Sequence, residues 1–429
     1  MHTKRYTGGD ISQHGKVTAP LLGERRFSGD GGVAMSTGPA KRSFDTVQEM
    51  VLIAHGQLDP AVWEYATFGA ETETTVRRNR FALDALAIKP RIARDMSRID
   101  PRASLFGRVL RIPALLAPMG SITRFDAAGL SATARAAMAF GTIAFIASHA
   151  TDGAPMPEDI RGLPTIYAIH PDGDDASFDA EIDKATHHDC LAVSIATQSA
   201  FYSRRERDIH NGLHGKGQEI GVYAARVTPP RASSPGETVT PPLAEGSHAE
   251  MFEASLSKAR LSWDLVRRVR RRCELPVIVK GIQTAQDAAI AVEHGVDVIY
   301  VSNNGGRALD HVRASMEALP EIAGAVGGRA QIIVDGGFVR GTDIIKAIAL
   351  GADAVCLGRL QAWALAANGE AGVVRMLEIL EEEIVIAMGL MGARSLADIV
   401  PDCVTRVEPC TPPHPLSAFP IVMERLAQG

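Results

Sequence analysis

Between about residue 112 and residue 360 the chain repeats one pattern eight times. Each repeat is a short apolar run that ends in polar or glycine residues, followed by an alanine-rich stretch with helical spacing. The eight runs are PALLAPM, TIAFIAS, LPTIYAI, CLAVSI, LPVIVKG, DVIYVSN, QIIVDGG and DAVCLGR. Continuous apolar strands of this kind suit a parallel sheet that is covered by helices. Eight strand–helix units therefore predict an α/β fold, a closed (β/α)8 TIM barrel.

Two helices in the second half are marked by their end signals. In TAQDAAIAVEHG, Thr284 can cap the first turn and Gly295 can end the helix in a left-handed conformation. The segment GTDIIKAIALGA repeats this design. A strand follows each of them at once, which is typical of a barrel and not of a sandwich.

Three segments lie outside the repeat. Residues 1–45 are rich in Gly, Ser and basic residues without an amphipathic period, and we expect a disordered arm. Residues 46–400 form the predicted barrel domain, which opens with a helical extension. Residues 211–258 contain TPPRASSPGETVTPPLAEG, which predicts a long loop after the fourth strand, over the mouth of the barrel. We expect residues 401–429 to be a tail that wraps the barrel or a neighbouring subunit.

Charge and cysteine content exclude several function classes. The 45 basic and 50 acidic residues give a net charge of -5 and are scattered, so no nucleic-acid footprint is predicted. No apolar run is long enough to span a bilayer. Five cysteines without a CxxC pair predict neither a zinc site nor a disulfide framework, and they favour a cytoplasmic setting. We expect His187 and His188, before the fourth strand, to be solvated on the far rim, without a metal.

The ends of the strands carry the candidate chemistry, because barrel enzymes gather reactive groups at the carboxyl ends of their strands. The seventh and eighth runs lead into DGGFVRGTD and GR, which supply glycine backbone N–H groups and the cations Arg340 and Arg359. This combination predicts a phosphate cup. Lys280 ends the fifth run, where an inward ammonium group needs an anionic partner.

Several long motifs carry a resemblance to a known family. The segments YATFGAE, VKGIQTAQDA, VSNNGGRALD, VDGGFVRGTD and ALGADAVCLGR, in this order, resemble the signature segments of the FMN-dependent 2-hydroxy-acid oxidases and dehydrogenases. The resemblance runs from about residue 45 to residue 400. It implies FMN as cofactor, a small carboxylate-bearing substrate that gives a hydride to FMN, and a homo-oligomer, a tetramer in this family.

The resemblance also implies the roles of individual residues. FMN would contact Pro118, Met119, Gly120, Ser148, Thr165, Ser194, Lys280, Ser302, Asp335, Gly336, Gly337, Arg340, Gly358 and Arg359. The substrate carboxylate would be held by Tyr65, Tyr167, Arg205 and Arg307. Arginine suits this task because its guanidinium offers a planar fork to a carboxylate.

One position departs from the family in a way that changes the chemistry. The family segment reads SNHGGR, whereas this chain reads SNNGGR and places Asn304 where the histidine base stands. A neutral amide cannot accept a proton near pH 7. The aspartate that pairs with that histidine aligns near Ala196. His149, which replaces a tryptophan, is either a substitute base or a neutral histidine that fills space, so the candidate catalytic residues are Asn304, His149 and Tyr167.

Three functions remain open from the sequence. The first is an FMN-dependent oxidoreductase with an altered substrate or mechanism, for example one that takes hydride from a neutral amine. The second is an FMN enzyme without net redox change, like the type II isopentenyl-diphosphate isomerases, and the third is a catalytically silent flavin- or ligand-binding protein. The presence of Arg205 and Arg307 favours the first.

Overall fold

The computed structural model describes residues 43–428 except 151–155, 172–174, 199–202 and 214–260. Most of the predicted arm and most of the predicted loop after the fourth strand therefore lie outside the described residues. No helix among the described residues is long and apolar enough to cross a membrane.

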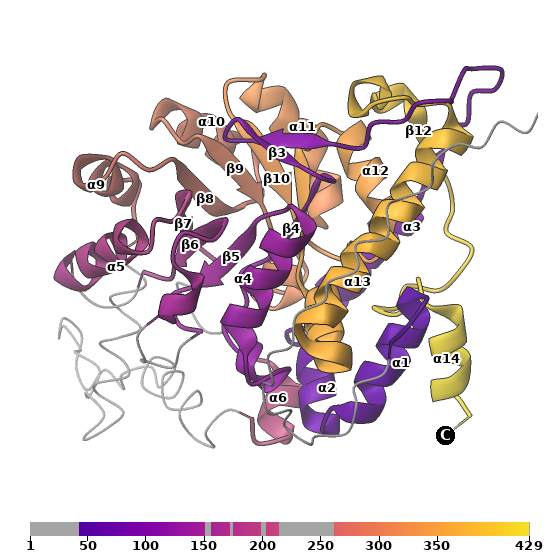
Figure 1. Ribbon diagram of the computed structural model, residues 1–429, viewed down its shortest axis with the longest axis horizontal. Coiled ribbons are helices and arrows are strands. Elements are labelled where there is room, and N and C mark those ends of the chain that lie inside the picture. Colours follow the sequence, from indigo (N-terminus) through magenta and orange to yellow (C-terminus); the bar gives the residue numbers. More distant parts are fainter. Residues whose placement is uncertain (1–42, 151–155, 172–174, 199–202, 214–260, 429) are drawn as a thin grey trace, which may run out of the picture. The chain divides into compact units, whose positions relative to one another are not determined.

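Eight parallel strands close into a barrel in which each strand pairs with the next in sequence and β11 pairs with β4 (Figure 1). The strands are β4 Ala114–Leu116, β5 Ala144–Ala147, β6 Thr165–Ile169, β7 Ala192–Ala196, β8 Val277–Ile282, β9 Val298–Val301, β10 Gln331–Val334 and β11 Ala354–Leu357. Each predicted run coincides with one of them, and only β7 and β8 continue one residue beyond the predicted run. The predicted TIM barrel is confirmed.

Helices follow the strands and cover the outside of the barrel (Figure 1). They are α4 Gly129–Phe140, α5 Asp175–His187, α6 Glu206–His210, α9 Asp264–Arg272, α10 Ala285–Glu293, α11 Ser315–Val326, α12 Gly341–Ala349 and α13 Arg359–Met391. The end signals of α10 act as predicted: Thr284 Oγ1 accepts a hydrogen bond from the Asp287 N–H at 3.1 Å, and Gly295 has a φ of 77°.

The segments before and after the barrel pack on it. Three helices form the extension: α1 Val47–Gln57, α2 Pro60–Thr67 and α3 Thr74–Asp84. Two strands, β2 Ala103–Leu105 and β3 Arg108–Leu110, form a hairpin. In the C-terminal tail, β12 Val404–Arg406 pairs with β1 Leu86–Ile88, and α14 Pro420–Leu426 lies beside α1 (Figure 1). The short 3-10 helices are η1 Ile122–Arg124, η2 Glu158–Ile160, η3 Asn304–Gly306, η4 Leu396–Asp398 and η5 Pro401–Cys403.

The barrel strands present alternate side chains to two separate cores, because successive residues of a strand face opposite sides. On β6, Ile166 and Ala168 join the inner core, in which the rings of Phe145 and Tyr300 lie 5.5 Å apart. Tyr167 belongs to the outer core between strands and helices. The register of each strand thus decides which side chains can reach the interior of the barrel.

A buried ion pair joins the extension to the barrel. Two nitrogens of the Arg80 guanidinium donate to the two oxygens of Asp343 at 2.7 Å each, and Arg80 also donates to the Gly337 carbonyl at 2.9 Å. Burial opposes ionisation of Asp343, but Arg80 and the N–H of Val339 hold its pKa below the usual value. This pair fixes α3 against the glycine-rich turn after β10.

We expect Asp343→Asn to destabilise the protein by about 3 to 5 kcal/mol, because it removes the fully buried counter-ion of Arg80 and leaves its guanidinium with the more exposed Asp84 alone. Urea unfolding of the purified variant measures this change. The matched control is Asp402→Asn, which removes the exposed pair that Lys89 forms with Asp402 and should cost less than about 1 kcal/mol. Equal effects of the two substitutions would contradict a structural role for the buried pair.

Candidate active site

Lys280 lies at the centre of a polar cluster at the carboxyl ends of β8, β9 and β10. Its side chain faces the interior of the barrel, and the residue is only 6% exposed. Its Nζ donates to Gln198 Oε1 at 3.1 Å, Ser302 Oγ at 3.2 Å and Asn304 Oδ1 at 3.3 Å, and lies 3.9 Å from Asp335 Oδ2. Burial lowers the pKa of Lys280, and the charge of Asp335 opposes this shift. Lys280 is therefore inward, as predicted.

Two polar atoms of the cluster are buried without a hydrogen-bond partner in the described part of the chain. They are Ser194 Oγ, on the inner face of β7, and Asp335 Oδ1. The other oxygen of Asp335 accepts a hydrogen bond from the Tyr300 hydroxyl at 3.0 Å. An unmatched buried polar atom costs about 1 to 3 kcal/mol. These atoms therefore fit a polar group that the protein binds here.

Arg359 is the cation of the predicted phosphate cup. It starts α13, and its guanidinium donates to the backbone carbonyls of Thr67, Phe68 and Gly305 at 2.9 to 3.1 Å. It forms no ion pair with any residue that the structure describes. Burial, with a contribution from the charge of Arg307, lowers the pKa of Arg359 to about 9. A desolvated guanidinium without a carboxylate suits an anionic ligand such as a phosphate.

Two glycines after β10 complete this end of the cup. Gly336 and Gly337 have φ values of 112° and 92°, which disfavour any other residue. A Cβ on Gly336 would also come within 3.1 Å of Ser315 Oγ and 3.2 Å of Asn79. Gly358, at the N-cap of α13, has open space around it. The N-terminus of a helix attracts anions, which favours a phosphate there.

Arg340 does not join the cup. Its guanidinium pairs with Glu383 Oε1 of α13 at 2.6 Å, and Glu383 Oε2 accepts a hydrogen bond from the Gly341 N–H at 2.7 Å. Glu383 therefore already neutralises both Arg340 and the N-terminus of α12. The predicted phosphate contact of Arg340 does not fit this position. Its partner is 43 residues away in the sequence, so no local pattern could have revealed it.

The predicted carboxylate-binding residues Arg205, Arg307 and Tyr65 come together around a residue that the sequence did not suggest. Arg307 Nη2 donates to Asp208 Oδ2 at 3.0 Å, and Arg205 Nη1 lies 3.9 Å from the same oxygen. The guanidinium of Arg307 lies 4.3 Å from the centroid of the Tyr65 ring, and the Tyr65 hydroxyl donates to Ser121 Oγ at 3.0 Å. The sequence does contain one signal for the role of Asp208, because Arg205 and Asp208 are three residues apart, a spacing at which side chains on a helix can interact.

Tyr167 and Thr165 lie outside this cluster. The Tyr167 hydroxyl donates to Glu181 of α5 at 2.5 Å, and Thr165 contacts Cys190 Sγ at 3.5 Å. Burial, together with Glu181, raises the pKa of Tyr167. Both residues occupy the outer face of β6, so the predicted substrate and catalytic roles of Tyr167 and the FMN contact of Thr165 do not fit their positions. Successive residues of a strand face opposite sides, so an inward Ile166 requires Thr165 and Tyr167 to face outward.

His149 has a partner that the sequence analysis missed. Its Nδ1 lies 2.9 Å from Nδ1 of His170, and the two rings meet edge to face with centroids 3.9 Å apart. The backbone N–H of His170 donates to Ser148 Oγ at 3.0 Å, which fixes the end of β6 to the end of β5. A Cβ on Gly120 would collide with the His149 ring. Strand alternation could have indicated His170, because position 170 follows the inward-facing residues Ile166 and Ala168 at the same spacing of two.

The remaining predicted positions lie at the same end of the barrel. Pro118 and Met119 follow β4 and lead into Gly120. Asn304 has a φ of 54°, and its backbone N–H donates to Ser302 Oγ at 3.0 Å. Ala196 ends β7 in register with Lys280 and supplies no carboxylate. The amide oxygen of Asn304 therefore accepts a hydrogen bond from Lys280, and the alanine at position 196 cannot supply a carboxylate to pair with residue 304.

The charges of these clusters add up to a site for anions. The charged groups are Lys280, Arg205, Arg307 and Arg359, which are cationic, and Asp208 and Asp335, which are anionic. This set carries two more positive than negative charges. Cationic side chains in such a cluster suit anionic groups such as a phosphate or a carboxylate.

The fold and this site define a TIM barrel that binds a phosphate-bearing cofactor at the carboxyl ends of its strands. The family model described as FMN-dependent dehydrogenase matches residues 54–406. The chain therefore belongs to the FMN-dependent dehydrogenase family, and the predicted family and cofactor, FMN, are confirmed.

Named relatives agree with this assignment. An L-lactate oxidase of Nostoc sp. is 34% identical over 351 residues, which are 81% of this chain and 94% of the relative. Glycolate oxidase 1 of Oryza sativa subsp. indica is 34% identical over 82% of this chain and 93% of the relative. A crystal structure of mandelate oxidase matches with a TM-score of 0.72 and 30% identity over 86% of this chain and all of that chain. A similar structure, with a TM-score of 0.69 and 32% identity over 82% of this chain and 97% of that chain, is a mandelate oxidase variant with a C4a-OH-FMN adduct.

We expect Arg359→Ala to weaken FMN binding roughly 10- to 100-fold, because a hydrogen bond to a charged group contributes about 1.5 to 3 kcal/mol. Release of FMN, followed by the fluorescence of the free flavin, measures the dissociation constant. Arg340→Ala is the matched control and should change this constant little, because Glu383 already binds that arginine. Equal losses in both variants would contradict the assignment of the cup to Arg359.

Proposed function

We propose that this chain, which is an FMN-dependent oxidoreductase, oxidises a small carboxylate-bearing substrate, a 2-hydroxy acid or a related 2-amino acid, and that His149 takes up the substrate proton. The observation that carries this proposal is the presence of Arg205 and Arg307 and of the His149–His170 pair at the same end of the barrel. The names of the relatives, which are oxidases of lactate, glycolate and mandelate, support the substrate class.

The arginine cluster accounts for recognition of the carboxylate. Arg307 is held by Asp208 on one side and by the ring of Tyr65 on the other, so its guanidinium is oriented before the substrate arrives. Arg205 donates to the backbone carbonyl of Arg307 at 2.9 Å and brings a second positive charge to the same place. The planar guanidinium groups of Arg205 and Arg307 suit a bidentate interaction with a substrate carboxylate.

A continuous set of contacts connects the arginine cluster to His149. Tyr65 packs on Arg307 and donates to Ser121. The residue before Ser121 is Gly120, and the missing side chain of Gly120 leaves the space that the His149 ring fills. These contacts support a place for His149 beside the proposed substrate site, near β4 and β5, whereas Asn304 follows β9.

The proton step follows from the pairing of the two histidines. When bound, FMN would accept the hydride of the substrate, which carries both electrons, so that one proton remains to be taken up. In the tautomer that we propose, His149 Nδ1 carries the hydrogen that is shared with His170 Nδ1, 2.9 Å away, and His149 Nε2 is the unprotonated nitrogen that accepts the proton of the substrate hydroxyl or amine. When His149 becomes charged, its hydrogen bond to His170 becomes charge-assisted and holds the imidazolium in place. Asn304 cannot take this role because its amide accepts no proton.

The proposed compartment and assembly are a reducing cytoplasm and a homo-oligomer, a tetramer. The five cysteines are free, which suits a reducing compartment. Apolar side chains exposed on the surface, including Ile92 at 88% and Leu390 at 75%, support contacts with other subunits.

Anaerobic mixing of the protein with a panel of 2-hydroxy and 2-amino acids should bleach the flavin band with at least one substrate. With that substrate, we expect His149→Ala to slow flavin reduction about 10²- to 10⁴-fold while FMN stays bound, which is the usual contribution of a general base. In the wild type the rate should rise with pH as the histidine loses its proton, and this rise should be absent in His149→Ala. An unchanged rate in His149→Ala would overturn the role of His149, and a silent panel would overturn the proposed oxidation.

The control for this experiment is Asn304→His. We expect it to restore little activity toward lactate, because Ala196 provides no carboxylate and the ammonium of Lys280, 3.3 Å from the present amide, disfavours a charged imidazole. Rapid oxidation of lactate by the unmodified protein would show that the missing base at position 304 does not limit the site.

A further inference from the structure

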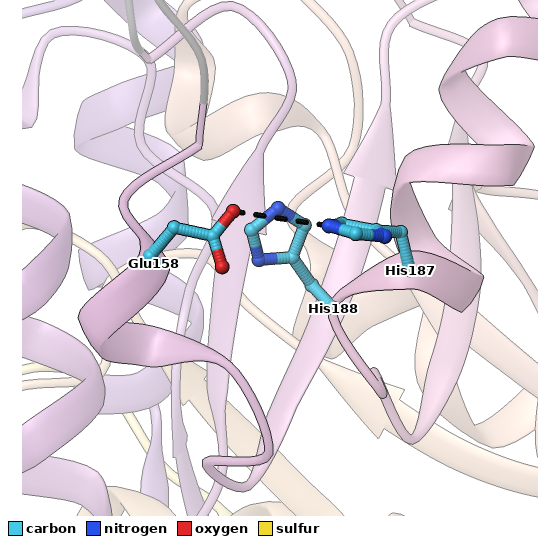
Figure 2. Close-up of side chains that lie close together, drawn as sticks. All are labelled: Glu158, His187 and His188. Atoms are coloured by element: carbon cyan, nitrogen blue, oxygen red, sulfur yellow. Dashed lines mark ion pairs between the residues drawn. The ribbon is translucent and has the colours of Figure 1, made fainter.

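Three side chains of types that can ligate a metal lie close together at the amino ends of the barrel strands. Glu158 begins η2, before β6, whereas His187 ends α5 and His188 follows it, before β7. One ligand atom from each residue lies within 4.8 Å of the other two. His187 Nε2 lies 3.8 Å from Glu158 Oε1, and the ring centroids of His187 and His188 are 5.1 Å apart (Figure 2).

Backbone hydrogen bonds hold the three residues in place. The N–H of Gly162 donates to the carbonyl of His188 at 3.2 Å, which ties the turn after η2 to the end of α5. The N–H of Arg161 donates to the carbonyl of Glu158 at 3.1 Å and closes the turn that carries the carboxylate. The cluster is therefore built by two connections, β5 to β6 and β6 to β7.

His188 is the unusual member of the cluster. We expected both histidines to be solvated, and this is wrong for His188, which is 5% exposed. Its Nδ1 has no hydrogen-bond partner among the described residues. Such a nitrogen is costly to bury. His187 and Glu158, by contrast, have side chains that are 59% and 72% exposed and can move toward it.

We propose that Glu158, His187 and His188 bind a divalent transition-metal ion, with zinc as the best fit. Two imidazole nitrogens and one carboxylate oxygen form a donor set that zinc prefers, whereas magnesium and calcium prefer oxygen ligands alone. Zinc bonds of about 2.0 to 2.2 Å place tetrahedral ligands roughly 3.4 Å apart. The exposed side chains of Glu158 and His187 can close the present spacing by rotating, while the buried ring of His188 stays in place.

The position of this site indicates a structural role. It lies at the amino ends of β6 and β7, and the reactive groups of a TIM barrel lie at the carboxyl ends. A bound ion would link the β5–β6 connection to the turn between α5 and β7. The β5–β6 connection begins with Ser148 and His149, and the β6–β7 connection begins with His170. The ion would therefore hold the later parts of the two segments whose first residues form the histidine pair.

The test uses the FMN-loaded protein, stripped of metal with EDTA and titrated with zinc chloride in a calorimeter. Cys410→Ser serves as the background, because the exposed thiol of Cys410 could bind zinc. We expect Glu158→Gln and His187→Asn each to weaken zinc binding at least about tenfold, and Asp189→Asn, beside the cluster but outside it, to leave binding unchanged. Zinc should raise the thermal midpoint of the background protein, and magnesium should not.

Crystals soaked in zinc give a second readout that does not depend on the variants. An anomalous peak between Glu158, His187 and His188 supports the proposal. Zinc isotherms that are the same in the background protein, Glu158→Gln and His187→Asn would overturn it, as would an anomalous signal elsewhere with none at this cluster. Retention of the flavin absorbance shows that each variant is folded, and the flavin reduction rate separates this result from the test of His149.

Discussion

A buried ammonium group sets the conditions for the flavin site. Lys280 faces the interior of the barrel, where a charge is tolerated only with several partners. The acceptors come from the ends of neighbouring strands, and one of them is the side chain of Asn304. An amide at position 304 can stabilise the ammonium without competing for its proton. The same contact makes this position unsuitable for a positively charged base.

The excess of positive charge at the mouth follows from the same principle. Asp335 balances part of the charge of Lys280, and Asp208 balances part of the charge of Arg307, but Arg359 donates only to backbone carbonyls within the described chain. Burial lowers the pKa of Arg359, so binding of an anion there recovers the cost of desolvation. Arg340 has no such need because Glu383 neutralises it.

The proposed proton acceptor, His149, lies at the end of β5, whereas Asn304 follows β9. His149 and His170 come from adjacent strands, so the hydrogen bond between their rings depends on the register of the barrel alone. The His149 ring occupies the space that a side chain at position 120 would fill. The next residue, Ser121, accepts a hydrogen bond from the Tyr65 hydroxyl. The proposed base is therefore separate from the hydrogen bonds that Lys280 makes with Ser302 and Asn304.

The sequence by itself determined the barrel and the glycine turn, because apolar strands, the caps of α10 and glycines with positive φ are local signals. It also placed Lys280 and Arg359, since strand ends meet at one edge of a barrel. The tertiary structure alone decided the face of Tyr167, the partner of Arg340 and the burial of His188. The physical reason is that a shift of one residue reverses the face of a strand, and that ion pairs and burial depend on segments far apart in the chain.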